Sequence, residues 1–366
     1  MDGTTYKLLG ASAALSGSVE ASLTNAEYTS THSIFTLEAG HAATITLDFF
    51  SPVSPKNYVR QSLPFSYLTV SVAAEEVSEV QVYSDIDESW TGQSGNTVST
   101  FTLYEQVSLF ELSVNGAATY SESSQSQALW GQTVFGAKES SGVTVSYESG
   151  SASTLRSQFS SKGSLSNTSP TFATGDAVAI SQDLGSVTSS SATFAVGYVR
   201  EAAINYLGNA MTGYYRAQYP ETTSAISFFF DDYASAYSES LTYDTLLMQY
   251  SVAAAGTNYS DIIALTPRQA YGGTELTIPN NTLDTSNAMV FLKEISSDGN
   301  VNTCELIPFN IYILLSICAN HARNTIKAGM LLIFGCSGRD ISSIPNLVRN
   351  KSRIYPTSSG AGPSVP

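Results

Sequence analysis

Residues Thr44-Ile-Thr-Leu-Asp-Phe49 decide the fold, because apolar and polar side chains alternate along them one by one. Successive side chains of a β-strand point to opposite faces, so the pattern predicts a strand with one buried and one solvated face. Turn-forming clusters such as Ser51-Pro-Val-Ser-Pro55 separate such runs. The same alternation recurs at Leu68/Val70/Val72, Val80/Val82/Ile86, Val143/Val145 and Phe194/Val196. With no long helix in view before residue 205, the sequence predicts an antiparallel β-sandwich over residues 1–205.

After residue 205 the apolar period lengthens to three and four residues. It predicts one helix that starts after Pro220-Glu221 and carries the stripe Ile226, Phe229, Phe230, Tyr233, Tyr237 and Leu241. A second helix is predicted from an N-cap at Ser260 to Gly272-Gly273, kinked or shortened by Pro267. Met289–Ile295 reads as a strand, with a turn over residues 296–300. Residues 206–303 are thus expected to form a partial α-helical domain, which gives an α+β fold class.

Charge and cysteine usage change together at Cys304. Ten basic and 29 acidic residues precede it, whereas six basic and two acidic residues follow, and all three cysteines lie at or beyond it. Such a joint change is rare inside one folded domain. We therefore expect residues 304–366 to be an unassigned, aberrant tail.

Composition limits the partners of this chain. The net charge of −15 makes nucleic acid and anionic membranes poor partners, because phosphate binding needs clustered Lys and Arg. The apolar stretches 307–318 and 329–336 are each shorter than the roughly 20 residues of a membrane-spanning helix. The sequence contains no HExxH motif, P-loop, dinucleotide fingerprint or G-x-S-x-G elbow. A small-molecule partner is therefore expected, with no metal and no cofactor.

Acidic residues and one arginine are the candidates for a functional site. Asp85 and Asp87 lie two apart in a predicted strand, so both carboxylates share one face; they could serve glycosidic acid–base chemistry, bind a cation or simply be solvated. Arg268 could clamp a carboxylate or hold the helices against the sandwich. Glu294 and Asp298 flank the turn after the last predicted strand, where binding loops are commonly built. The catalytic residues themselves stay unknown at this point.

Three sequons point to secretion. Asn167, Asn258 and Asn280 each begin an N-x-Ser/Thr triplet, which marks N-glycosylation sites on exposed segments of secreted proteins. The opening residues Met1-Asp-Gly-Thr-Thr-Tyr6 show neither the basic start nor the apolar run of a signal peptide.

Several stretches resemble the fungal glutaminase A family. They are Asp2-Gly-Thr-Thr-Tyr6, Ser51–Pro55, Arg60–Leu68, Val80–Asp87, Ala195–Arg200, Arg268-Gln-Ala270 and Phe291–Thr303. The resemblance implies a secreted protein with an N-terminal β-sandwich and an (α/α)₆ six-hairpin toroid. It also implies hydrolysis of glutamine to glutamate and ammonia. The alternatives are a glycoside-hydrolase-like enzyme or a carbohydrate-binding protein, because sandwich-plus-toroid architectures also occur there.

The resemblance ends at residue 303. We hypothesise that the tail is translated from a retained intron or a shifted frame, which would make the chain truncated. The stripe at Phe229–Leu241 would then lack helical partners, so we expect an inactive or aggregation-prone polypeptide.

Overall fold

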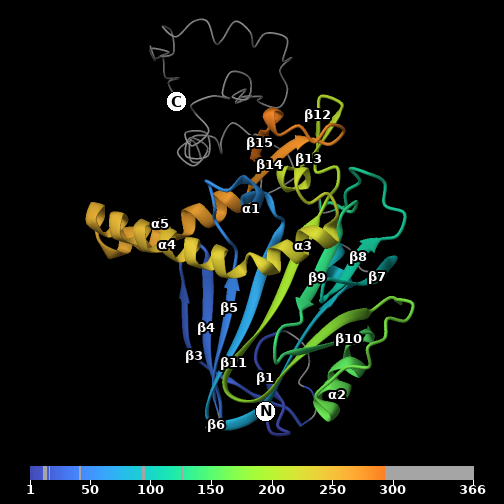
Figure 1. Cartoon of the computed structure of the whole chain (residues 1–366), viewed down its shortest axis with the longest axis vertical. Coiled ribbons are helices and arrows are strands. Elements are labelled where there is room, and N and C mark those ends of the chain that lie inside the picture. The colour runs from blue at the N-terminus through green and yellow to red at the C-terminus, as the bar shows by residue number, and fades with distance from the viewer. Residues whose placement is uncertain (11–14, 16, 41–42, 93–94, 125–126, 293–366) are drawn as a thin grey trace, which may run out of the picture.

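The structure is a computed structural model that describes residues 1–292, except for 11–14, 16, 41–42, 93–94 and 125–126 (Figure 1). A nine-stranded sheet dominates this described part. Its strands follow the order β3-β4-β5-β6-β11-β9-β8-β7, with β10 paired to β11, and all these pairings are antiparallel. The strands are β3 (Ser22–Tyr28), β4 (His32–Ala39), β5 (Ala43–Phe50), β6 (Phe65–Asp87), β7 (Thr97–Tyr104), β8 (Val107–Val114), β9 (Gln132–Lys138), β10 (Thr144–Ser151) and β11 (Asp176–Val199).

Two long strands hold the sheet together. β6 has 23 residues and β11 has 24, and they pair along most of their length with register shifts between Asp183 and Gly185 and between Val187 and Ser189. The first half of β6 also pairs with β5, while the first half of β11 pairs with β10 and its second half with β9. Irregularities of this kind bend strands and increase their twist. The two halves of each strand can therefore contribute to different layers.

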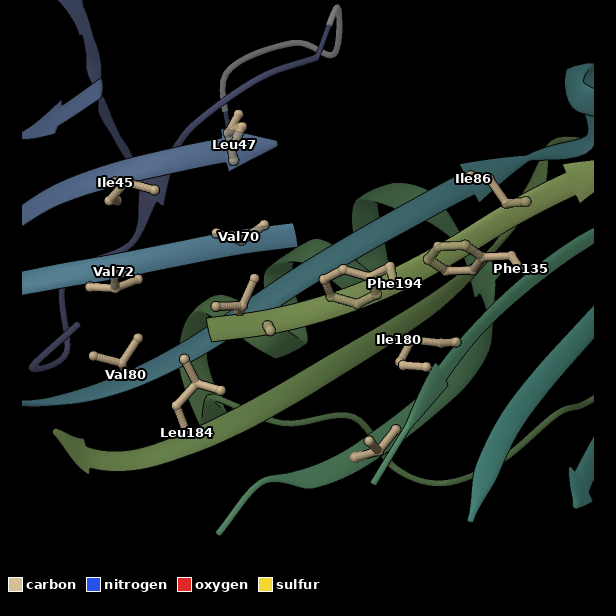
Figure 2. Close-up of a cluster of buried hydrophobic side chains, with 14 of the residues drawn as sticks. Ile45, Leu47, Val70, Val72, Val80, Ile86, Phe135, Ile180, Leu184 and Phe194 are labelled. Atoms are coloured by element: carbon tan, nitrogen blue, oxygen red, sulfur yellow. The ribbon is translucent and has the colours of Figure 1, made fainter. Parts of the chain in front are cut away.

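The central core lies between these layers (Figure 2). One cluster of buried side chains contains Ile45 and Leu47 of β5 together with residues from both halves of β6 and β11. Val70 and Val72 come from the first half of β6, and Val80, Val82 and Ile86 from the second half. The apolar positions of the alternating pattern thus lie in or against this core. The predicted antiparallel sandwich is confirmed.

The opposite face of the sheet is also buried, which the alternation did not predict. Tyr67, expected on the solvated face, is 2% exposed. Its ring stacks on Phe229 with centroids 3.8 Å apart, and its hydroxyl donates to the Phe229 carbonyl. Phe50, Leu109 and Val134 belong to the same second cluster, beneath the helices. The physical reason is that helices from later in the chain cover this face and remove it from water.

Those helices are α3 (Thr222–Asp231) and α4 (Tyr233–Ala255), so the single predicted helix is in fact two. They cross the strands near one end of the sheet (Figure 1). Ile226 and Phe229 are buried, and Tyr233 and Tyr237 pack against the second cluster. The expectation that this stripe lacks partners is wrong up to Tyr237, because its partner is the sandwich. Only Leu241, 50% exposed, lies beyond the cover.

Helix α5 (Thr257–Gly272) runs back along α4. It begins three residues before the predicted start, because Ser260 is not the cap but a buried residue that accepts a hydrogen bond from Ser251 of α4 at 2.8 Å. Pro267 lies inside the helix and does not shorten it, whereas the predicted end at Gly272 is confirmed. The predicted strand is confirmed as β15 (Met289–Leu292) up to the last described residue, while positions 293–300 lie outside the described residues.

The remaining elements are small. A second sheet contains β12, β13, β14 and β15, and β1 pairs with β2 in parallel. Helix α2 was missed by the sequence analysis, because few of its side chains are apolar and only Leu155 is buried. The other bounds are β1 (Tyr6–Lys7), β2 (Val19–Glu20), α1 (Tyr58–Ser62), η1 (Glu88–Thr91), α2 (Ala152–Lys162), β12 (Ile204–Tyr206), β13 (Asn209–Gly213), η2 (Tyr214–Ala217), β14 (Thr274–Pro279) and η3 (Thr285–Asn287).

Candidate functional site

A cleft of about 500 Å³ opens where the ends of β8 and β9 meet η2 and the start of α3. Its floor is the outer face of the sheet. On β8, Glu111 and Ser113 continue the row of Val107 and Leu109, which are buried under the helices. Helix α3 starts only at Thr222, so this end of the row is left uncovered. Polar side chains therefore line a recess beside a dry interface.

A close backbone approach forms one wall of the cleft. A Cβ atom added to Gly131 would lie 2.4 Å from the Tyr198 ring, so no other residue fits without movement. The Gly131 amide donates to the Tyr198 hydroxyl at 3.1 Å, and that hydroxyl donates to the Ala128 carbonyl at 2.7 Å. Burial raises the pKa of Tyr198, so its hydroxyl stays protonated and able to donate.

Trp130 forms the adjoining wall and is held in place from two sides. Its indole N–H donates to the Ala202 carbonyl at 2.8 Å, and the Arg200 guanidinium lies 5.5 Å from the ring centroid. Arg200 also forms an ion pair with Glu275 of β14 at 2.8 Å. Since the indole is anchored at both its N–H and its ring, it can present a rigid apolar surface to a ligand.

Charged groups of both signs line the cleft. Arg216 of η2 lies 3.9 Å from Glu201, at the limit of an ion pair, and the Glu201 side chain is 71% exposed. The Nε atom of Arg216 is buried and has no hydrogen-bond partner within the described residues. Burial raises the pKa of Glu111. Glu221 caps α3 without a side-chain hydrogen bond. The arrangement can bind a small molecule that carries both charges.

The carboxylates singled out in the sequence lie away from this cleft. Asp85 accepts two hydrogen bonds from Arg156 of α2, at 2.7 and 2.8 Å, and a third from the Tyr83 hydroxyl at 2.7 Å. Asp87 caps η1 by accepting from the Ser89 amide at 3.0 Å. Asp85 thereby holds α2 against β6, and Asp87 starts a turn. Neither residue lines the cleft described above.

Arg268 lies at the junction of the helices and the sandwich. It donates to the Ser33 hydroxyl of β4 at 2.6 Å, and burial lowers its pKa while Asp244 of α4 opposes that shift. Thr31, beside β4, donates to the same Asp244 at 2.6 Å. The contacts match the alternative in which Arg268 holds the helices against the sandwich. Glu294 and Asp298 lie outside the described residues.

The three sequon asparagines differ in exposure. Asn167 and Asn258 are exposed, on a loop and in the first turn of α5, whereas Asn280 is half-buried at the end of the small sheet. The Asn167 side chain accepts from the Tyr147 amide at 3.1 Å. A glycan on Asn167 would be attached to the Nδ2 atom, so it is compatible with this contact, which is accepted by Oδ1.

Neither a candidate membrane-spanning helix nor a candidate metal-binding cluster is present in the part of the chain that the structure describes. None of its helices is long and apolar enough to cross a membrane. Among residues 1–292, apart from the gaps given above, no group of three or more His, Cys, Asp or Glu side chains is placed to hold a metal ion.

Comparison with known proteins brings two family matches. Residues 31–250 match the domain of unknown function DUF5127, and residues 256–332 match the glutaminase A six helical-hairpin domain. The chain belongs to the glutaminase A family. The six-hairpin match runs past the predicted break at Cys304. The first match ends at residue 250, inside α4, and the second begins at residue 256, just after this helix. The predicted division at residues 205 and 303 stays a prediction.

Curated relatives carry the same family name. The chain is 32% identical over 330 residues to "Glutaminase A" of Aspergillus oryzae, which covers 84% of this chain and 45% of the relative. It is 29% identical over 309 residues to "Probable glutaminase" of Arthroderma benhamiae, covering 75% of this chain and 34% of the relative. The chain thus spans less than half the length of these two glutaminases.

Solved structures are more distant. A heparan sulfate lyase, HepC of Pedobacter heparinus, aligns with a TM-score of 0.27 at 8% identity over 49% of this chain and 22% of the lyase. The heparinase III BT4657 gene product aligns with a TM-score of 0.28 at 6% identity, over 53% of this chain and 23% of that chain. Scores this low carry no argument about this chain.

Sequence reasoning missed the residues of the cleft. Glu111 interrupts the apolar strand Val107–Val114, and a charge within such a strand is a signal that could have been used. Trp130-Gly131 is a second signal, because a glycine beside a large aromatic often marks close backbone approach. Arg216 gave no local signal. Its place in the cleft depends on η2 packing beside the sheet, which no short stretch of sequence encodes.

Proposed function

We propose that this protein takes part in the hydrolysis of the side-chain amide of glutamine outside the cell, giving glutamate and ammonia. The observation that carries the proposal is membership of the glutaminase A family, with a six-hairpin match that continues from α5. The three sequons support an extracellular location, since two of the three asparagines are exposed.

The reaction needs a water molecule, a general base to activate it and donors for the oxyanion. Asp85 and Asp87 are occupied by structural contacts, so Glu294 and Asp298, which follow β15, remain the proposed acid–base candidates. The described residues would supply the platform: a sandwich whose outer face supports the first helical hairpin, and the charged cleft beside it.

The expected inactivity loses one of its reasons here. It depended on an aromatic stripe without partners, and the stripe from Phe229 to Tyr237 is packed against the sandwich. The expected inactivity stays a prediction, and the assay below tests it.

The test is an assay of the purified chain with glutamine, asparagine and a panel of aryl glycosides side by side. Ammonia and glutamate released in equal amounts from glutamine, with the glycosides intact, is the expected result. Cleavage of a glycoside, or a folded chain that releases ammonia from neither amide, would contradict the proposal. The panel also separates the glycoside-hydrolase-like alternative from the glutaminase.

A further inference from the structure

The cleft holds a guanidinium whose hydrogen-bonding capacity is only partly used. Arg216 has a buried Nε atom without a partner in the described part of the chain, and its ion pair with Glu201 is 3.9 Å long. Arg216 lines the cleft, and a guanidinium matches a carboxylate, which can accept two parallel N–H bonds from it. Since the Glu201 carboxylate lies at the limit of an ion pair, a ligand carboxylate that comes closer to the guanidinium gains affinity.

The same cleft holds a carboxyl group without a partner. Glu111 makes no hydrogen bond or ion pair that involves the described residues, and burial raises the pKa of this side chain. A partly desolvated carboxylate is destabilised until a cation reaches it. A ligand ammonium fits this position, because it supplies both the opposite charge and the missing donors.

The start of α3 adds to the positive end of the cleft. Thr222 and Thr223 line it, and the Glu221 side chain does not cap their amide groups. The first N–H groups of a helix have no partner inside the helix and favour a negatively charged neighbour. Arg216 lines the same cleft.

We propose that the cleft binds the head group of a free α-amino acid, with its α-carboxylate at Arg216 and the first amides of α3, and its α-ammonium at Glu111. This inference rests on the proposed function for the identity of the side chain, which would be that of glutamine. Trp130 and Gln132 also line the cleft, and they supply an apolar surface and an amide for that side chain. A volume of about 500 Å³ accommodates such a ligand with ordered water.

The two charges give a direct way to test each contact. Binding to the purified full chain is measured by isothermal titration calorimetry with three probes. They are L-glutamine, glutaramic acid, which lacks the ammonium, and 4-aminobutanamide, which lacks the carboxylate. We expect L-glutamine to bind at least about tenfold more tightly than either analogue, because each analogue leaves one buried charge unpaired.

Each substitution should weaken the binding of only those probes that carry the charge it contacts. Arg216→Gln is expected to weaken the binding of L-glutamine and of glutaramic acid by about tenfold, and to leave the affinity for 4-aminobutanamide unchanged. Glu111→Gln is expected to weaken the binding of L-glutamine and of 4-aminobutanamide by a similar factor, and to leave the affinity for glutaramic acid unchanged. Glu76→Gln, on an exposed position of β6, is the matched control and should change nothing. Arg216→Lys keeps the charge without the fork, so partial binding should return if Arg216→Gln fails to fold.

The outcomes separate this inference from the proposed function. Glutamine hydrolysis that is unaffected by Arg216→Gln, or L-glutamine that binds no better than its analogues, would overturn the inference and leave the function standing. Tight binding of L-glutamine without its hydrolysis would support the inference and contradict the proposed function. Glucose or N-acetylglucosamine that binds the wild-type chain and is lost in both variants would show a sugar site instead, which overturns the amino-acid assignment.

Discussion

At the residue scale, the side chains that matter most are charged groups that are partly buried and lack the partners that usually accompany burial. Within the described part of the chain, Glu111 sits in an apolar strand without a partner, and Arg216 keeps a buried nitrogen without a hydrogen bond. Asp85 is the opposite case, because Arg156 and Tyr83 satisfy it fully. The sequence pointed to the carboxylates of Asp85 and Asp87, whereas the candidate site contains Glu111 instead. Pairing is decided by neighbours in space, which the sequence does not give.

Replacing Glu111 with Gln should raise the stability of the protein near neutral pH. Because burial raises the pKa of this carboxyl, the folded state holds the proton more tightly, and stability falls as the pH rises through that raised value. The neutral amide removes this loss. The melting temperature of Glu111→Gln should therefore exceed that of wild type at about pH 7 and equal it at about pH 3. A lower melting temperature at neutral pH would mean that Glu111 has a stabilising partner.

Gly131→Ala should damage both stability and the cleft. The new methyl group would lie 2.4 Å from the Tyr198 ring and 2.8 Å from the Val199 carbonyl oxygen, so the wall must move. Overpacking of this kind costs about 1–3 kcal/mol in the free energy of unfolding, which urea titration measures. The control is Ala117→Ser on the rim of the cleft, which should change the free energy of unfolding little. Gly142→Ala is unsuitable as a control, because Gly142 has a positive φ. An unchanged unfolding midpoint for Gly131→Ala would contradict the geometry.

At the element scale, the alternation of side chains predicts each strand but not what lies on both of its faces. Val70 and Val72 were correctly expected inside the sandwich, whereas Tyr67 was expected in water and is covered by Phe229 of α3. The two residues are 162 positions apart, so no local pattern links them. Helix α2 was missed for a related reason: it buries a single leucine, and its ion pair between Arg156 and Asp85 joins residues far apart in the sequence.

The joint between α1 and the α3–α4 turn depends on Arg60. This arginine is 5% exposed and binds Asp232 through two hydrogen bonds, at 2.5 and 2.7 Å, and also Glu239. Arg60→Gln leaves Asp232 buried without its partner, which typically costs about 3–5 kcal/mol. The matched control is Lys138→Gln, which breaks the exposed ion pair with the neighbouring Asp231 and should cost less than about 1 kcal/mol.

Chemical denaturation of both variants measures the difference. Equal losses for Arg60→Gln and Lys138→Gln would mean that the buried ion pair does not fasten the helices to the sandwich. Circular dichroism at the same time reports whether α3 and α4 remain helical when the joint is opened.

At the scale of the whole molecule, the described residues form a sandwich with a helical hairpin that reaches past its edge (Figure 1). The α4–α5 hairpin exposes large apolar side chains: Leu246, Met248, Tyr250, Val252, Tyr259, Ile262 and Leu265. The sequence indicated an exposed apolar helix face, but placed it too early, at residues that pack on the sheet. The order of sandwich and helices could be predicted, because the spacing of apolar residues changes from two residues to three or four along the chain. The cleft could not be foreseen, because it is built from five separate segments.

The exposed face of the hairpin should promote self-association. Ile262 is 66% exposed, so Ile262→Lys removes apolar contact area without opening a cavity. Sedimentation velocity over a range of concentrations should show less association for this variant than for wild type, with the same melting temperature. Ile226→Lys, at a fully buried position of α3, is the contrasting change and should unfold the protein. Equal association of wild type and Ile262→Lys would show that the hairpin face is not the contact.

The most direct measurement is a crystal structure of the protein grown with L-glutamine. We expect electron density for the amino acid in the cleft beside Trp130, with its α-carboxylate at Arg216 and its α-ammonium at Glu111. An empty cleft in a crystal that binds glutamine elsewhere, or glutamine bound with its charges reversed, would contradict the account.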